Sequence, residues 1–111
     1  MNRRYNRKMV LGYACTNRWA TEYALDAGFE QNFLFCTAMD VSARAKSSKG
    51  EGPLFLTIEH KGNIYPFFAV QSTDPNDDIF PGGPSASQAE CIEKLKEIMG
   101  KTRPPTWYRA Y

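Results

Sequence analysis

The residues with the clearest capacity for chemistry are the only histidine, His60, and the glutamate beside it, Glu59. Metal-free cleavage of RNA uses a general acid, a general base and a cation to stabilise the charged phosphate. Glu59, His60 and a nearby arginine are of these types. Neighbouring residues of a strand point to opposite faces, so the pair cannot address one phosphate unless a bulge intervenes. We therefore expect no catalytic residue, and a small ribonuclease is the alternative.

Neither the cysteines nor the acidic residues have the spacing of a metal site. The three cysteines, Cys15, Cys36 and Cys91, form no CxxC or Cys/His pattern. The acidic segment TDPNDD, residues 73–78, lacks the alternation and the closing glutamate of a calcium loop. Gly82-Gly83 is not followed by the Lys-Ser/Thr pair of a phosphate-binding loop. The sequence thus predicts no metal and no cofactor.

Basic residues gather at both ends of the chain, and aromatic residues join them at the second end, although the net charge is only +2. If the ends lie near one another, they form a basic patch with aromatic edges that suits RNA or a protein partner. Solvated, flexible ends are the alternative. We expect weak RNA binding without cleavage. The candidate binding residues are Arg3, Arg4, Arg7, Lys8, Arg103, Trp107, Tyr108 and Arg109.

A β-hairpin over residues 53–71 is the predicted scaffold for these groups. Its first arm, LFLTIEH, alternates apolar and other residues with the period of a strand. Gly62 and Asn63 enter positive φ readily, so the chain can reverse there. A two-residue Gly62-Asn63 loop would scatter the second arm's apolar residues over both faces. We expect a three-residue loop, which places His60 opposite Ile64 and collects Leu54, Leu56, Ile58, Ile64, Phe68 and Val70 on one face.

Two helices are predicted on either side of the hairpin. The first follows the N-cap residues Thr16 and Asn17 and ends at Gly28. The second begins at Ser87, which forms an S-x-x-E capping box with Glu90, and runs to Met99. Its predicted buried stripe is Cys91, Ile92, Leu95, Ile98 and Met99. Residues 9–15 and 33–39 are predicted strands, and residues 40–52 a mobile loop rich in Ser, Lys and Gly.

This order of elements predicts an α+β fold: an antiparallel sheet with a central hairpin and one or two helices packed on one side. A ferredoxin-like arrangement is the alternative. With 111 residues the chain fits one domain. We expect a flexible basic N-terminus over residues 1–8, the domain over 9–100, and an extended C-terminal tail over 101–111. No apolar run approaches the ~20 residues that span a bilayer, so no membrane partner is expected. No targeting segment is visible, so the protein is either cytoplasmic or follows a removed signal.

The chain resembles a family of small secreted effectors of powdery-mildew fungi with a ribonuclease-like fold. Tyr13-Ala14-Cys15 has the Tyr-x-Cys form of that family's N-terminal motif, ahead of a helix, a hairpin and a late Cys91. The resemblance implies a ribonuclease-like scaffold without working catalytic residues and a disulfide between Cys15 and Cys91, with Cys36 free. The predicted helix from Ser87 to Met99 and the tail after it are longer than that family's usual ending, and the basic leader precedes the motif.

The same resemblance implies a function. It suggests a secreted protein that acts in the host cell on a host protein and is recognised by an intracellular plant immune receptor. A virus-encoded inhibitor of a host defence would use the same surface-binding physics and is a further alternative.

Overall fold

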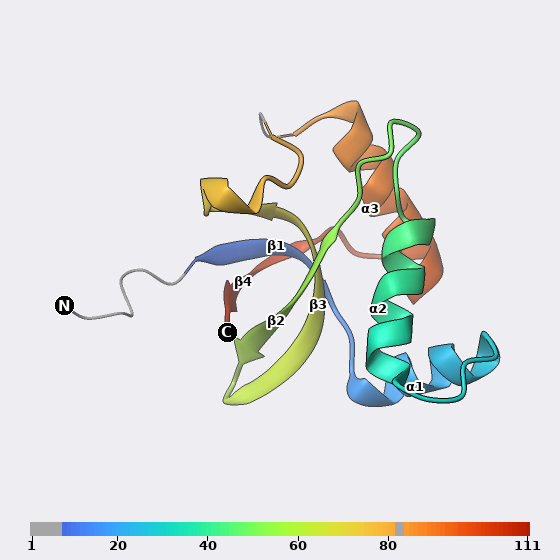
Figure 1. Cartoon of the computed structure of the whole chain (residues 1–111). Helices are drawn as coiled ribbons and strands as arrows, with labels where there is room; N and C mark the ends of the chain where they lie inside the picture. Colours follow the sequence, from blue (N-terminus) through green and yellow to red (C-terminus); the bar gives the residue numbers. More distant parts are fainter. Residues whose placement is uncertain (1–7, 82–83) are drawn as a thin grey trace.

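The computed structural model describes residues 8–81 and 84–111, and it has an α+β fold, as predicted (Figure 1). The elements in chain order are β1 (Met9–Ala14), α1 (Asn17–Asp26), α2 (Phe33–Arg44), β2 (Leu54–His60), β3 (Asn63–Ser72), the short 3-10 turn η2 (Pro75–Asp77), α3 (Ala86–Met99) and β4 (Thr106–Ala110). Within the described ranges, no helix combines the length and the hydropathy that a bilayer crossing requires.

The four strands close into a small barrel in the order β1-β3-β2-β4, with every neighbouring pair antiparallel. Both faces of the sheet carry apolar residues: closure buries the inner face, and the helices cover part of the outer face. The inner face buries Val10, Ile58, Phe67, Ala69 and Ala110 in one cluster. The helices lie together on one side of the barrel (Figure 1). A second cluster joins them to the strands, and its buried members are Tyr13, Cys15, Ala20, Val41, Ala45, Phe68, Val70, Phe80, Cys91, Leu95 and Met99.

Gly12 lies where β1 comes closest to β3. The pairing register shifts between Leu11 and Gly12, which marks a bulge. A Cβ on Gly12 would overlap the carbonyl oxygen of Phe68 and lie 2.9 Å from its carbonyl carbon and 3.0 Å from the Cα of Ala69. The missing side chain therefore allows the close strand approach that this tight barrel needs.

The hairpin is where the sequence predicts it, but the predicted loop is wrong. His60 pairs with Asn63, so the loop has two residues, Lys61 and Gly62. Both have positive φ, 51° and 79°, as in the tight turns that match strand twist. Ile64 pairs with Glu59 instead of His60. The objection to a Gly62-Asn63 loop does not apply to this register, which pairs Leu56 with Phe67. The predicted single apolar face is also wrong: Phe67 and Ala69 lie in the barrel interior, whereas Phe68 and Val70 belong to the cluster that joins the helices to the strands.

The predicted strand over residues 33–39 is also wrong, because this segment begins helix α2. The buried side chains Thr37, Ala38 and Val41 recur at helical spacing, and Ala45 continues the stripe at the end of the helix. Thr37 donates its hydroxyl to the carbonyl of Ala20 at 2.6 Å, which fixes α2 against α1.

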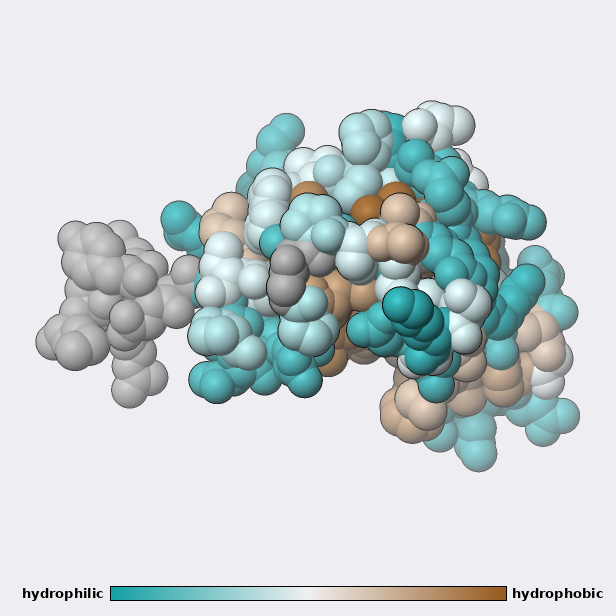
Figure 2. All heavy atoms as spheres, turned by 90° about the horizontal axis from the view of Figure 1, so that it is seen from above, coloured by the Kyte–Doolittle hydropathy of each residue, from teal (hydrophilic) through white to brown (hydrophobic). Residues whose placement is uncertain are grey.

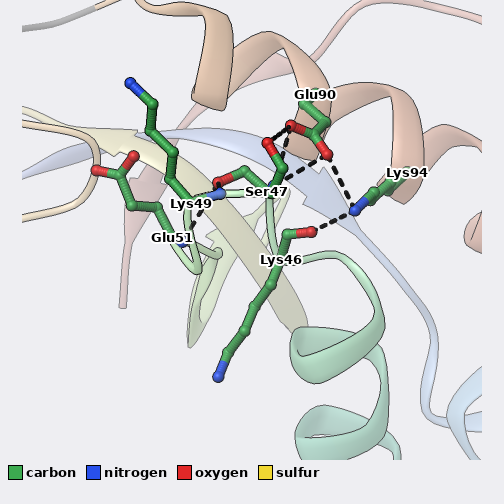
Figure 3. A network of polar contacts seen from close by, with 7 residues as sticks. Lys46, Ser47, Lys49, Glu51, Glu90 and Lys94 are labelled. Carbon is green, nitrogen blue, oxygen red and sulfur yellow. Dashed lines mark hydrogen bonds and ion pairs between the residues drawn. The ribbon is translucent and has the colours of Figure 1, made fainter.

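The predicted mobile loop over residues 40–52 is wrong at its start, because residues 40–44 belong to α2. The loop that follows α2 is tethered to α3 (Figure 3). The carboxylate of Glu90 accepts the backbone N–H and the hydroxyl of Ser48 at 3.0 and 3.1 Å. Lys94 forms an ion pair with Glu90 at 3.2 Å and donates to the carbonyl of Lys46. The Ser48 N–H and Lys94 hold the pKa of Glu90 below its ordinary value, against a small opposing effect of burial.

Glu90 therefore is not part of a capping box. The N-cap of α3 is Ser85, whose hydroxyl accepts the N–H of Gln88 at 3.1 Å, and Ser87 lies inside the helix. The predicted buried stripe is confirmed: Cys91, Leu95 and Met99 are buried, and Ile92 and Ile98 pack beside them. The helix ends at Gly100 in the left-handed conformation.

The predicted C-terminal tail is extended, but it belongs to the barrel. Residues 106–110 form β4, which pairs with four residues of β1 and with Ile58 and Glu59 of β2. The N–H of Ala110 also donates to the carbonyl of Lys8 at 3.0 Å. The two ends of the described chain thus lie side by side.

Candidate functional site

One end of the barrel is open and forms a cavity of about 310 Å³, here called the barrel-mouth pocket. Because the strands are antiparallel, the last residues of β1 and β2 and the first residues of β3 meet there, with β4 beside them. The start of α1 and the end of α3 complete the wall. The lining residues are Ala14, Cys15, Thr16, Trp19, Ile58, His60, Tyr65, Met99, Lys101 and Tyr108.

Aromatic rings dominate this pocket and are held by their neighbours. The rings of His60 and Tyr108 meet edge to face, with centroids 5.2 Å apart and an angle of 90° between the planes. Phe67, from the barrel interior, supports Tyr108 from behind at 5.5 Å. On the α1 side, Trp19 packs on Tyr23 at 5.3 Å. The pocket is therefore walled by rings whose positions are set by packing.

The charged lining residue of the barrel-mouth pocket is Lys101, and the lining contains no carboxylate. The backbone N–H of Lys101 donates to the carbonyl of Lys96 at 2.9 Å, so the end of α3 places this lysine at the pocket. An anionic or neutral aromatic ligand matches this lining, whereas a cationic ligand has no charged partner there.

Cys15 also lines the pocket, but it is not an activated nucleophile. It is 7% exposed, and burial raises the pKa of its thiol to about 11, although Lys101 opposes the rise. The thiolate is the reactive form of cysteine, so this side chain stays protonated and inert at neutral pH. The pocket thus has no nucleophilic thiol.

A second, more open cavity of about 660 Å³ runs beside β4 and the hairpin turn, and we call it the β4 groove. Trp107 is 43% exposed on it, and Lys61 and Arg109 supply positive charge. Glu59 pairs with Arg109 across the two strands, so one carboxylate lies near this charge. The lining residues are Met9, Glu59, His60, Lys61, Gly62, Thr106, Trp107, Tyr108 and Arg109. His60 and Tyr108 line both cavities and form the wall between them.

The structure brings together three of the candidate binding residues that the sequence indicates, Trp107, Tyr108 and Arg109, in the β4 groove. Lys8 lies apart from them, since its ammonium forms an ion pair with Asp77 at 2.9 Å. Arg103 lines neither cavity, and its carbonyl accepts the hydroxyl of Tyr13 at 2.8 Å. Arg3, Arg4 and Arg7 lie outside the described residues.

The residues of the Tyr-x-Cys motif are both in the core. Tyr13 is 1% exposed, and burial, with a contribution from Glu93, raises the pKa of its hydroxyl. Cys15 and Cys91 are buried as free thiols, so the disulfide implied by the resemblance is not formed in this structure. Cys36 is a half-buried free thiol on α2.

Glu59 and His60 alternate in orientation, because β2 pairs with β3 without interruption from Leu54 to His60. Both nevertheless border the β4 groove, which opens where β2 ends. Sequence reasoning missed Trp19, Tyr65 and Lys101. Trp19 is on α1, Tyr65 is on β3 and Lys101 follows the end of α3, and their chain positions give no signal that they share a pocket.

The outer side of α2 is unusually apolar for a surface helix. The exposed fractions of Leu34, Phe35 and Met39 are 39%, 66% and 60%. Figure 2 shows apolar surface at the lower right, on the side of the molecule where α1 and α2 lie in Figure 1. An exposed group of large apolar residues is typical of contact surfaces.

Among the described residues, no group of three His, Cys, Asp or Glu side chains could hold a metal ion. No family model, curated protein or solved structure matches the chain.

Proposed function

We propose that the protein is a non-catalytic binding module that holds single-stranded RNA in the β4 groove. The observation that carries this proposal is the exposed ring of Trp107 in the same groove as Lys61 and Arg109. Single-stranded nucleic acid is held by aromatic rings that stack on bases and by cations that track the phosphates. A small barrel offers a rigid surface on which both kinds of group stay in place.

Positive charge exceeds negative charge in the lining of the groove, where Lys61 and Arg109 stand against Glu59. Glu59 pairs across the strands with Arg109, and Lys61 lies on the hairpin turn that follows β2. The balance of charge therefore favours a polyanion.

Binding without cleavage is the expected activity. His60 is the only histidine of the chain, and Cys15 is protonated at neutral pH. A phosphodiester cleavage needs a proton acceptor and a proton donor that reach one phosphate together. The alternating orientation of Glu59 and His60 in an unbroken strand disfavours that arrangement.

The test measures RNA affinity and RNA integrity in one experiment. Labelled single-stranded RNA is titrated with protein at low salt, followed by fluorescence anisotropy, and is then run on a denaturing gel. Trp107→Ala should weaken binding roughly 5- to 150-fold, because a stacked base contributes ~1–3 kcal/mol. Phe35→Ala, on α2, is the matched aromatic control and should bind like the wild type.

The salt dependence gives an independent check. Lys61→Asn removes one cation and suits the left-handed turn position, so it should keep the fold. The slope of log affinity against log salt should fall by about 0.7 per lost phosphate contact. Unchanged affinity in Trp107→Ala would refute the groove as the RNA site. Turnover that disappears in His60→Ala would instead establish the ribonuclease.

The apolar side of α2 favours a second candidate: an effector that contacts a host protein, as the resemblance to secreted effectors suggests. Phe35 and Met39 lie one helical turn apart and are both more than half exposed. Replacing both by serine should abolish the effect of the protein in plant cells while RNA binding persists. If RNA-binding variants alone abolish that effect, this second candidate is refuted.

A further inference from the structure

The barrel-mouth pocket has the features of a ligand site, and RNA bound in the β4 groove alone would leave this pocket without a role. Ligand sites are concave, mostly apolar cavities of ~300–1,000 Å³, and barrel mouths are one of their usual places. A volume of about 310 Å³ lies at the small end of that range, so the pocket suits a single ring system. Trp19, Tyr65 and Tyr108 supply aromatic surface from three different elements.

The wall between the pocket and the groove determines how a ligand can use both. His60 and Tyr108 line each cavity, and their rings meet edge to face at 5.2 Å. The wall is therefore one pair of side chains thick. If an RNA strand lies in the groove with one base, its next nucleotide can cross this wall and place its base in the pocket.

Each cavity also has its own lysine. Lys101 lines the barrel-mouth pocket, and Lys61 lines the groove. Consider a ligand with two ring systems, one in each cavity. The linker that joins the two rings would lie near Lys101 on one side of the wall and near Lys61 on the other. In single-stranded RNA that linker carries a phosphate, which is the charge these lysines would neutralise.

We propose that the barrel-mouth pocket takes one unstacked base of the bound RNA while the neighbouring nucleotide stacks on Trp107 in the β4 groove. This inference rests on the proposed function and adds the minimal ligand: two consecutive nucleotides, divided by the His60–Tyr108 wall. RNA recognition through splayed bases that stack on aromatic side chains is a common mode for single strands.

The two tryptophans of the chain provide separate reporters, since Trp19 lines the pocket and Trp107 lines the groove. In Trp107→Phe the fluorescence reports the pocket, and in Trp19→Phe it reports the groove. Each variant is titrated with oligouridylate at low salt, with correction for RNA absorbance. Both signals should change and saturate over the same concentration range. A uridine dinucleotide should bind at least 5-fold tighter than uridine monophosphate.

A charge variant tests the pocket without risk to the core. Lys101→Gln should lower the salt slope of RNA binding by about 0.7, because it removes one phosphate contact. Lys49→Gln, on the loop after α2 and lining neither cavity, is the matched control and should leave the slope unchanged. Urea midpoints equal to the wild type verify that both variants fold.

The outcomes separate this inference from the proposed function. A response of Trp107 without one of Trp19, with no effect of Lys101→Gln, would place RNA in the groove alone and overturn the inference only. No response of either tryptophan at low salt would overturn both. If Trp19 responds to an acidic peptide containing tyrosine and not to oligouridylate, the pocket takes a protein side chain and the inference is wrong.

Discussion

Replacing Gly12 by alanine should destabilise the barrel far more than a single methyl group usually does. The new Cβ would overlap the Phe68 carbonyl oxygen and lie 2.9 Å from the carbonyl carbon, and both are backbone atoms that cannot rotate away. Overpacking of a well-packed site costs ~1–3 kcal/mol and sometimes more. Because β1 would have to move away from β3 at the bulge, we expect about 3 kcal/mol or more for Gly12→Ala.

Urea unfolding followed by circular dichroism measures this loss, which is a large part of the ~5–15 kcal/mol that stabilises a typical domain. The melting temperature should fall by roughly 12 °C or more. Gly100→Ala is the control: its φ is 67°, but nothing lies within 4 Å of the added methyl. That variant should lose only the ~1–2 kcal/mol of a left-handed alanine. Equal losses in the two variants would refute the close approach of β1 and β3.

Three further predictions concern the hairpin, the thiols and the tethered loop. Leu56→Ala should lower the free energy of unfolding in urea by about 2 kcal/mol, because Leu56 packs on the barrel interior. Glu59→Ala should lower it by less than about 1 kcal/mol, and equal losses in the two variants would contradict the assigned strand faces. At pH 8 a thiol reagent should modify Cys36 first and the other two thiols only after unfolding, since burial raises their pKa values to about 11 and about 12. If only one thiol reacts after unfolding without reductant, the disulfide implied by the resemblance is present. Glu90 has a pKa below 4.5 in the fold, so its stabilising effect is present above pH 4.5 and is lost as the pH falls through the lowered value. The difference in melting temperature between wild type and Glu90→Gln should therefore shrink below about pH 4.5, and a constant difference would contradict the tether.

Local patterns predicted several elements well. The alternating arm before Lys61, the N-cap Thr16 and the left-handed Gly100 each act through residues close in sequence. These local patterns agree with the structure because turn and cap geometry depends on a few neighbouring dihedral angles. The strand arms and two of the three helices could therefore be read from the sequence with small errors at their ends.

The errors came from segments that tertiary contacts decide. The apolar run FLFCTAM at residues 33–39 suits a buried strand or a helix, and short apolar runs do not distinguish the two. The stripe of Ala38, Val41 and Ala45 would have indicated the helix, but the polar residues between them concealed it. The register of the hairpin failed for a related reason, because both faces of β3 are buried: the barrel interior covers one face and the helices cover the other.

The candidate site was partly predictable. Trp107, Tyr108 and Arg109 are adjacent in sequence, so their cluster on β4 follows from the chain itself. Trp19 and Lys101 reach the same end of the barrel only because α1 starts and α3 ends there. Charge at the chain ends was a weaker guide, since Lys8 is matched by Asp77.

The pairing of β4 with both β1 and β2 has a consequence for how the protein is made. β4 follows the other three strands in the chain, so a sheet of β1, β3 and β2 has two unpaired edges until residues 106–110 have been synthesised. Exposed strand edges invite pairing with other chains, and contacts between distant segments form slowly. The last strand closes both edges at once and brings Tyr108, the shared wall of the two cavities. Without β4 the sheet is thus exposed to aggregation and the wall between the two cavities is incomplete, and both conditions end with the same step.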